Sequence, residues 1–198
     1  MCCGTKRLVL IQCPADCVYL ASAREHPAAV VVRQQHRDVA FVSHALRDLS
    51  ERQSEMFFLV ATALIKQDPQ PHQPLQALLD EDVADAMAAL AGTLETASRG
   101  VIYDHRPASL PAERLVAQMK PIVAEAGRGL GSAFERDAAA VLRRIAEAAR
   151  DARAIDPPNR RAFLDLLGRV LARTDAAGEP AGRDAQAPPP EPSRLIVP

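Results

Sequence analysis

The side chains best equipped for chemistry gather in one short stretch, between residues 99 and 106. This stretch combines a fixed cation, a phenol, a carboxylate and an imidazole, on Arg99, Tyr103, Asp104 and His105. Of these groups the imidazole gains or loses a proton most easily near neutral pH. Such a set is suited to holding a ligand or to acid–base work beside a pocket. The same groups also serve as helix caps and mutual ion pairs, with the Tyr103 ring packed and its hydroxyl in water. We take these four as candidate ligand-binding residues and assign no catalytic residue.

The sequence lacks the common motifs that indicate a catalytic site. The sequence contains no G-x-S-x-G elbow, no H-E-x-x-H pair, no Walker loop and no C-x-x-C pair. Sites built from scattered residues leave no such trace. The missing motifs therefore favour a non-catalytic protein but do not exclude an enzyme. The sequence predicts no cofactor.

Two sets of side chains have the right types for a metal but the wrong arrangement. The four cysteines lack the C-x2-C spacing of common zinc sites and lie at positions 2, 3, 13 and 17. A second set recurs at spacings of four, three and four on an expected helix: His44, Asp48, Glu51 and Glu55. At 100° per residue this stripe lies opposite the apolar seam of that helix, so we expect it to face solvent. No metal site is predicted.

Composition narrows the class of protein. The chain has 198 residues, of which 48% are hydrophobic and 4% aromatic, with no Trp. One domain with appendages fits this length, and the aromatic content is poor for an all-β fold. A formal net charge of -1 provides no general attraction to nucleic acid or anionic lipid.

The strongest periodic signal predicts one long helix from about residue 36 to 67. Its apolar residues alternate at spacings of three and four, and they are Val39, Val42, Leu46, Leu49, Met56, Val60 and Ala63. Gln53 is the polar residue on this seam, where it would fix a register or pair with a neighbouring helix. Residues 56–65 are apolar all round except for Thr62, so we expect partners on every side or an oligomer interface. The candidate interface residues are Gln53, Met56, Phe57 and Phe58.

Four further helices follow from caps and periodicity. The second runs from about residue 75 or 80 to 99, with Gly100 at its end. Ser109 is an N-cap candidate for the third, and a capping box from Ser132 to Glu135 would open the fourth. Residues 156–158, Asp-Pro-Pro, would cap a short final helix.

The predicted fold is therefore an all-α antiparallel bundle of four to five helices over residues 36–173. Residues 1–35 form an N-terminal segment of uncertain order with β-prone runs at 8–11, 17–20 and 30–32. Its start resembles a secretory signal, but Pro14 and Asp16 interrupt the apolar run. Residues 174–198 are rich in Pro, Gly and charge and are expected to be a disordered tail.

These patterns favour a non-catalytic interaction or regulatory protein that binds another protein or itself, with a homo-oligomer expected. The alternative is a bundle that binds a small ligand or metal through Tyr103 and His105, with His44 or Glu51 as a further group, and that could be an enzyme. Nucleic-acid binding is the weakest hypothesis, because Glu147 and Asp151 lie at pairing distance among the arginines of residues 143–153. We expect a cytoplasmic protein with no membrane partner, since reduced thiols are usual there.

Overall fold

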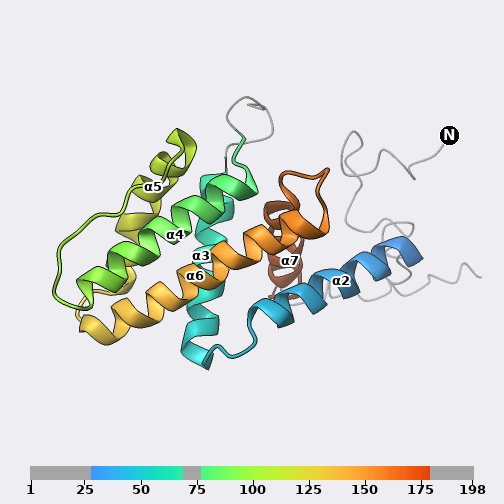
Figure 1. The fold of residues 1–198 in the computed structure, drawn as a ribbon. Helices are drawn as coiled ribbons and strands as arrows, with labels where there is room; N and C mark the ends of the chain where they lie inside the picture. The colour runs from blue at the N-terminus through green and yellow to red at the C-terminus, as the bar shows by residue number, and fades with distance from the viewer. Residues whose placement is uncertain (1–27, 69–76, 179–198) are drawn as a thin grey trace, which may run out of the picture.

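The computed structural model describes residues 28–68 and 77–178, and within these ranges all regular structure is helical (Figure 1). The all-α class is confirmed for this part of the chain. With the labels of Figure 1, the six helices are α2 (Ala29–Ala45), α3 (Glu51–Gln67), α4 (Asp80–Ala97), α5 (Leu110–Ala126), α6 (Gly131–Ile155) and α7 (Ala162–Gly178).

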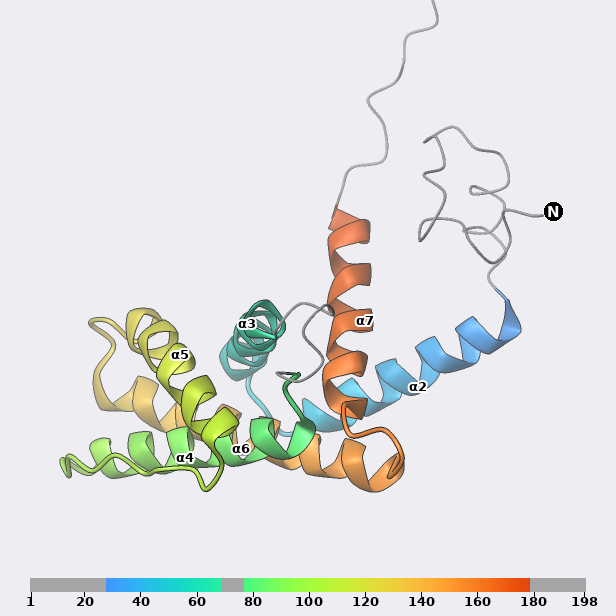
Figure 2. The same cartoon turned by 90° about the horizontal axis from the view of Figure 1, so that it is seen from above.

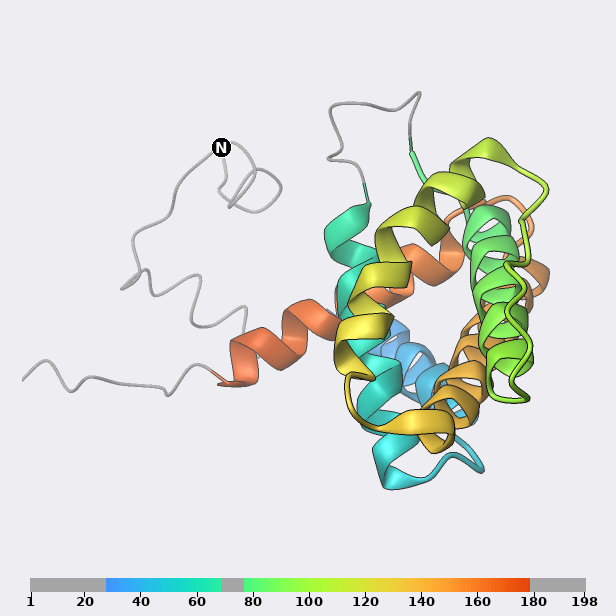
Figure 3. The same ribbon diagram turned by 90° about the vertical axis from the view of Figure 1, so that its left-hand side faces the viewer.

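The helices form two layers, with α4 and α6 in one and α3 and α5 in the other (Figures 2 and 3). Helices α4 and α6 run antiparallel. The N–H of Asp80, at the start of α4, donates to the carbonyl of Arg160 beyond the end of α6 at 3.0 Å. Near the other end of α4, Glu95 pairs with Arg143 of α6 at 2.9 Å. Buried alanines on both helices, including Ala84, Ala91, Ala146 and Ala149, allow the two backbones to approach closely.

The prediction of one long helix over residues 36–67 is wrong, because the chain turns between α2 and α3. Asp48 adopts a left-handed backbone conformation with φ 68°. Ser50 then starts α3: its hydroxyl accepts from the Gln53 N–H, and the Gln53 side chain accepts from the Ser50 N–H. From Val42 onward the apolar seam continues across the turn because both helices pack on the same core, whereas Val39 is exposed. The expected stripe is thereby broken up: His44 lies on α2, Asp48 in the turn, and Glu51 and Glu55 on α3.

Other helix ends are partly as predicted. Ser109 caps α5 by accepting from the Ala112 N–H at 3.2 Å, and Gly100 follows α4 with φ 78°. The capping box at Ser132 is not formed, since α6 begins at Gly131 and its N-cap residue is Leu130. Asp156 ends α6 instead of capping α7, which begins only at Ala162, after two prolines and three further residues.

The boundaries of the helical domain also differ from the prediction. The β-prone residues 30–32 lie in the first turns of α2, which begins seven residues before the expected start at 36. At the other end, α7 continues past residue 173 to Gly178. The cysteines, the β-prone runs at 8–11 and 17–20, and the tail over 179–198 lie outside the described residues.

Acidic residues at the start of α4 tie three helices together. The Asp80 carboxylate accepts from the backbone N–H groups of Phe163 and Leu164 at 2.9 and 3.2 Å, so it caps α7 from a neighbouring helix. Asp82 accepts from the Ser109 hydroxyl at 2.7 Å, and Asp85 accepts from the Ala108 N–H at 2.7 Å. The sequence alone indicates that Asp80 and Asp82 are favourable near the positive end of the α4 dipole. In the folded chain they also position α5 and α7.

Helix α2 is the least enclosed of the six. Its C-terminal half packs on the core through Val42 and Ala45, and its N-terminal half extends beyond the two layers (Figure 2). Val30, Val31 and Val39 remain 67%, 46% and 57% exposed. The N-terminal half of α2 therefore presents apolar side chains to solvent.

Candidate functional site

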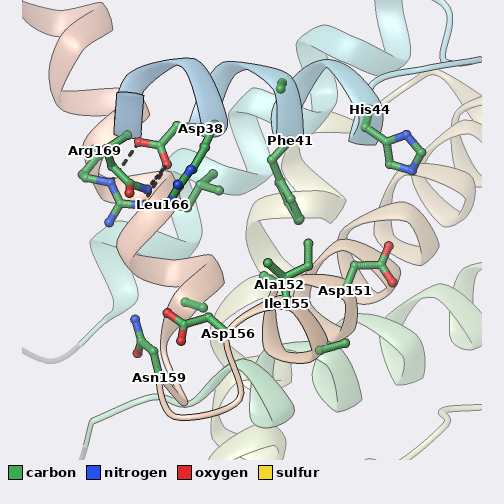
Figure 4. Close-up of a pocket in the computed structure, with 15 residues that line it drawn as sticks. Asp38, Phe41, His44, Asp151, Ala152, Ile155, Asp156, Asn159, Leu166 and Arg169 are labelled. Atoms are coloured by element: carbon green, nitrogen blue, oxygen red, sulfur yellow. Dashed lines mark hydrogen bonds and ion pairs between the residues drawn. The ribbon is translucent and has the colours of Figure 1, made fainter. Parts of the chain in front are cut away.

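An open groove of ≈ 1070 Å³ lies between α2, the C-terminal end of α6 and the first turns of α7 (Figure 4). Figure 4 shows Phe41 pointing from α2 toward Ala152 and Ile155 of α6. The apolar lining is Ala40, Phe41, Ala152, Ala154, Ile155, Ala162 and Leu166. The polar lining is Gln34, Arg37, Asp38, His44, Asp151, Asp156, Asn159 and Arg169. We call these residues together the α2 groove.

A charged clamp closes one end of the α2 groove. Asp38 of α2 is 1% exposed, and its two oxygens accept from Nε and Nη2 of Arg169 on α7, each at 2.9 Å. Gln34, one turn earlier on α2, donates to the same carboxylate at 3.0 Å. A two-pronged pair of this kind fixes both distance and orientation. The clamp therefore holds α2 at a set angle to α7 and gives the groove its width.

These contacts also determine the ionisation of Asp38. Burial raises the pKa of this carboxyl, but the hydrogen bonds from Arg169 and Gln34 and the charges of Arg169 and Arg173 outweigh it. The net result is a pKa below the ordinary value of 3.8. The carboxylate thus stays ionised under all mildly acidic conditions.

We expect acidification to weaken the clamp. A carboxyl whose pKa is lowered by folding contributes stability above its unfolded pKa and loses it as the pH falls through the folded value. The free energy of unfolding should therefore fall more steeply in the wild type than in Asp38→Asn as the pH drops below 3.8. Urea unfolding followed by circular dichroism at a series of pH values measures both slopes. Equal slopes would show that the pair contributes nothing.

A second groove of ≈ 830 Å³ lies between α3 and α5, and it contains part of the predicted interface. Phe58 and Leu59 of α3 face Pro121 and Ile122 of α5 across it. Leu59 is 45% exposed, so the apolar run over 56–65 is not covered on every side. We call this second groove the α3–α5 groove.

The other predicted interface residues contact the chain itself. Phe57 is 1% exposed and is part of the core, with its ring against Phe58 at 5.9 Å between centroids. Met56 is partly buried against the same core. Gln53 caps α3 and donates to Asp137 of α6 at 2.9 Å, so its amide binds a neighbouring helix of the same chain. Of the four residues, Phe58 is the one that lines an open groove described here.

The predicted ligand-binding residues lie along a strap that follows α4. Its backbone is tied to that helix, because Thr93 accepts from the His105 N–H at 3.0 Å and the Thr96 hydroxyl donates to the Tyr103 carbonyl at 3.3 Å. The Tyr103 and His105 rings meet edge to face at 4.8 Å. Asp104 pairs instead with Lys120 of α5 at 2.8 Å, and Arg99 is exposed. None of these four residues lines the α2 groove or the α3–α5 groove.

His105 is the most enclosed of the four. Its Nε2 atom is buried and has no hydrogen-bond partner among the described residues. The imidazole lies directly on Gly92 of α4: a Cβ added there would be 3.0 Å from the His105 Cγ. The absence of a side chain at residue 92 therefore makes room for this ring.

Gly92→Ala is expected to displace the strap. An alanine inside a helix normally adds about 0.5–1 kcal/mol of stability relative to glycine, but here its methyl group must move the His105 ring. We expect no net gain, and faster amide exchange at His105. Gly168→Ala in α7 is the matched control, because no atom lies within 4 Å of an added Cβ there, and it should show the gain. Equal gains in stability in both variants would mean that the His105 ring moves aside at no cost in free energy.

The basic residues at 143–153 are mostly engaged within the chain. Arg143 pairs with Glu95, Arg144 lies 3.7 Å from Glu147, and Arg153 donates to the Pro157 carbonyl. Arginines held in this way are less available to phosphate groups than free ones.

No motif in the sequence predicts the α2 groove. Its lining joins residues 34–44 of α2 to residues 151–169, more than a hundred positions further along the chain, and residues 30–32 suggest a strand. One signal was present: Asp38 is the only acid between residues 29 and 45 and has apolar neighbours on its C-terminal side. A lone carboxylate in such a segment needs a partner elsewhere.

Among the described residues, no three or more His, Cys, Asp or Glu side chains are grouped to hold a metal ion. The described helices also include none with the length and hydropathy needed to cross a bilayer.

Comparison with protein-family models, with curated proteins and with solved structures gives no significant match to this chain.

Proposed function

We propose that this protein is a non-catalytic interaction module that holds a protein partner in the α2 groove. The observation that carries the proposal is the combination of an open apolar floor with a mixed polar rim, beside a helix whose valines are exposed. Protein interfaces commonly have an apolar centre surrounded by polar groups.

The shape of the groove also favours a macromolecular partner. Small-ligand pockets usually enclose most of the ligand surface and place a few polar groups around it. Here the apolar surface continues out of the groove, because Ile155 is 73% exposed at its edge and Val39 is 57% exposed on α2. A helix or an extended segment would cover this surface, whereas a small molecule would leave most of it in water.

Site-specific photo-crosslinking in the cells that make the protein tests this proposal. Ala40 of α2 and Ala154 of α6 line the groove and are exposed, so each can be replaced by benzoylphenylalanine. Ala117 is an exposed alanine of α5 that lines neither groove and serves as the control. A probe at Leu59 reports on the α3–α5 groove in the same way.

We expect covalent protein adducts from the probes at Ala40 and Ala154 and none from Ala117. Adducts at Leu59 alone would move the interaction to the α3–α5 groove and contradict the proposal. Absence of adducts at all positions would also contradict it. Circular dichroism of each probe variant checks that the helices are intact.

A further inference from the structure

We infer that the partner in the α2 groove is a second copy of this chain, and that each copy lays its α2 helix in the groove of the other. This inference rests on the proposed function and names its partner. It depends on how charge is distributed between the two walls of the groove.

The exposed ionisable side chains of α2 are all basic or imidazole. They are Arg33, His36, Arg37 and His44. The one acid of this helix, Asp38, is buried and already holds Arg169. Neither Arg33 nor Arg37 forms an ion pair with any described residue. An approaching partner therefore meets a basic helix with apolar residues between its charges.

The opposite wall is acidic. Asp151 and Asp156 line it at the C-terminal end of α6, and both are exposed and without an ion pair among the described residues. A helix C-terminus carries a partial negative charge of its own, which adds to these carboxylates. This wall is therefore complementary to the exposed face of α2.

Within one chain these charges stay unpaired: Arg37 lines the same groove as Asp151 and Asp156 but forms no ion pair with either, and the Asp38–Arg169 clamp holds α2 in place. A two-fold arrangement of two copies would bring the two charged surfaces together. When α2 of each copy enters the groove of the other, Arg33 and Arg37 of one copy approach Asp151 and Asp156 of its partner, and the reciprocal contacts form as well. The same arrangement covers Val39 and Ile155.

Charge reversal with exchange of partners tests this inference. Arg33→Glu/Arg37→Glu and Asp151→Arg/Asp156→Arg are made in the full chain, with Arg114→Glu/Glu113→Arg on the exposed face of α5 as a control. Sedimentation equilibrium then gives the association constant of the wild type, of each variant, and of an equimolar mixture of the two groove variants.

We expect the wild type and the α5 control to dimerise, and each groove variant alone to associate roughly tenfold or more weakly. The mixture should dimerise like the wild type, because reversed charges then face each other at one half of the interface and native charges at the other. A misfolded variant would not be rescued in this way. A wild type that stays monomeric, a groove variant that dimerises normally, or a mixture that stays weak would overturn the inference.

The crosslinked adducts separate the failure of this inference from that of the proposed function. An adduct twice the mass of the chain agrees with both. An adduct with a different protein, together with a monomeric wild type, overturns the second copy and leaves the interaction module standing. A crosslink to residues 1–27 or 179–198 of the same chain overturns both.

Discussion

Asp80→Ala is expected to lower the free energy of unfolding by about 3 kcal/mol, because it removes the acceptor for two buried N–H groups at once. Asp80 is fully buried, and it caps α7 by accepting from Phe163 and Leu164. Without it these donors have no access to water. Since α7 forms one wall of the α2 groove, its first turn should also loosen.

Asp85→Ala is the matched control. Asp85 is on the same helix and also accepts from two backbone N–H groups, those of Ala108 and Ser109 at 2.7 and 3.4 Å. It is only partly buried, so water can replace it. We expect a loss of about 1 kcal/mol. Urea unfolding of both variants measures the difference, and equal losses would contradict the importance of burial at Asp80.

The pH dependence at Asp80 should be opposite to that at Asp38. Burial raises the pKa of Asp80, and the two backbone hydrogen bonds offset this only in part. The stabilisation from a raised carboxyl pKa is complete below the unfolded pKa and is lost as the pH rises through the folded value. The cost of Asp80→Ala should therefore be larger in acid than at neutral pH.

Gly127→Ala is expected to destabilise the protein by about 2–3 kcal/mol through overpacking. Gly127 ends α5 with φ −89°, a conformation that alanine adopts without strain. The obstacle is the Phe134 ring, since an added Cβ would lie 2.5 Å from its Cδ1 and closer still to Cε1. Phe134 is 5% exposed in the core and cannot swing into solvent at no cost.

A double-mutant cycle with Phe134→Leu checks this cause. The smaller side chain should leave room for the methyl group, so Gly127→Ala should cost much less in that background. We expect a coupling free energy of about 1–2 kcal/mol from thermal or urea unfolding. Additive effects would show that the clash with Phe134 does not explain the loss.

The sequence predicts helices better than it predicts their ends. Helices α4 and α5 are as expected, because Ser109 is a strong cap and an amphipathic pattern is legible from local residues alone. The prediction of one long helix over residues 36–67 is wrong. A heptad pattern indicates which face of a helix is buried, but it does not indicate whether the helix is continuous. The capping box between Ser50 and Gln53 was the overlooked signal.

The surface features are less predictable because they depend on distant residues. Residues 99–105 form a chemically rich stretch in sequence, but in the fold Asp104 binds Lys120 and the two rings contact each other. The Asp38–Arg169 clamp joins residues 131 positions apart. The lone acid at residue 38 indicates that a partner is needed, but no local pattern identifies Arg169 as that partner. This pair defines the groove on which the proposed function depends.

Hydrogen–deuterium exchange of the wild type at increasing protein concentration tests the central claim most directly. We expect amides in the first half of α2 to exchange fast at low concentration and to become protected as the second copy binds, together with those at the end of α6. Amides of α5 should not change. Protection of α2 that is independent of concentration, or a change confined to α3 and α5, would contradict the account.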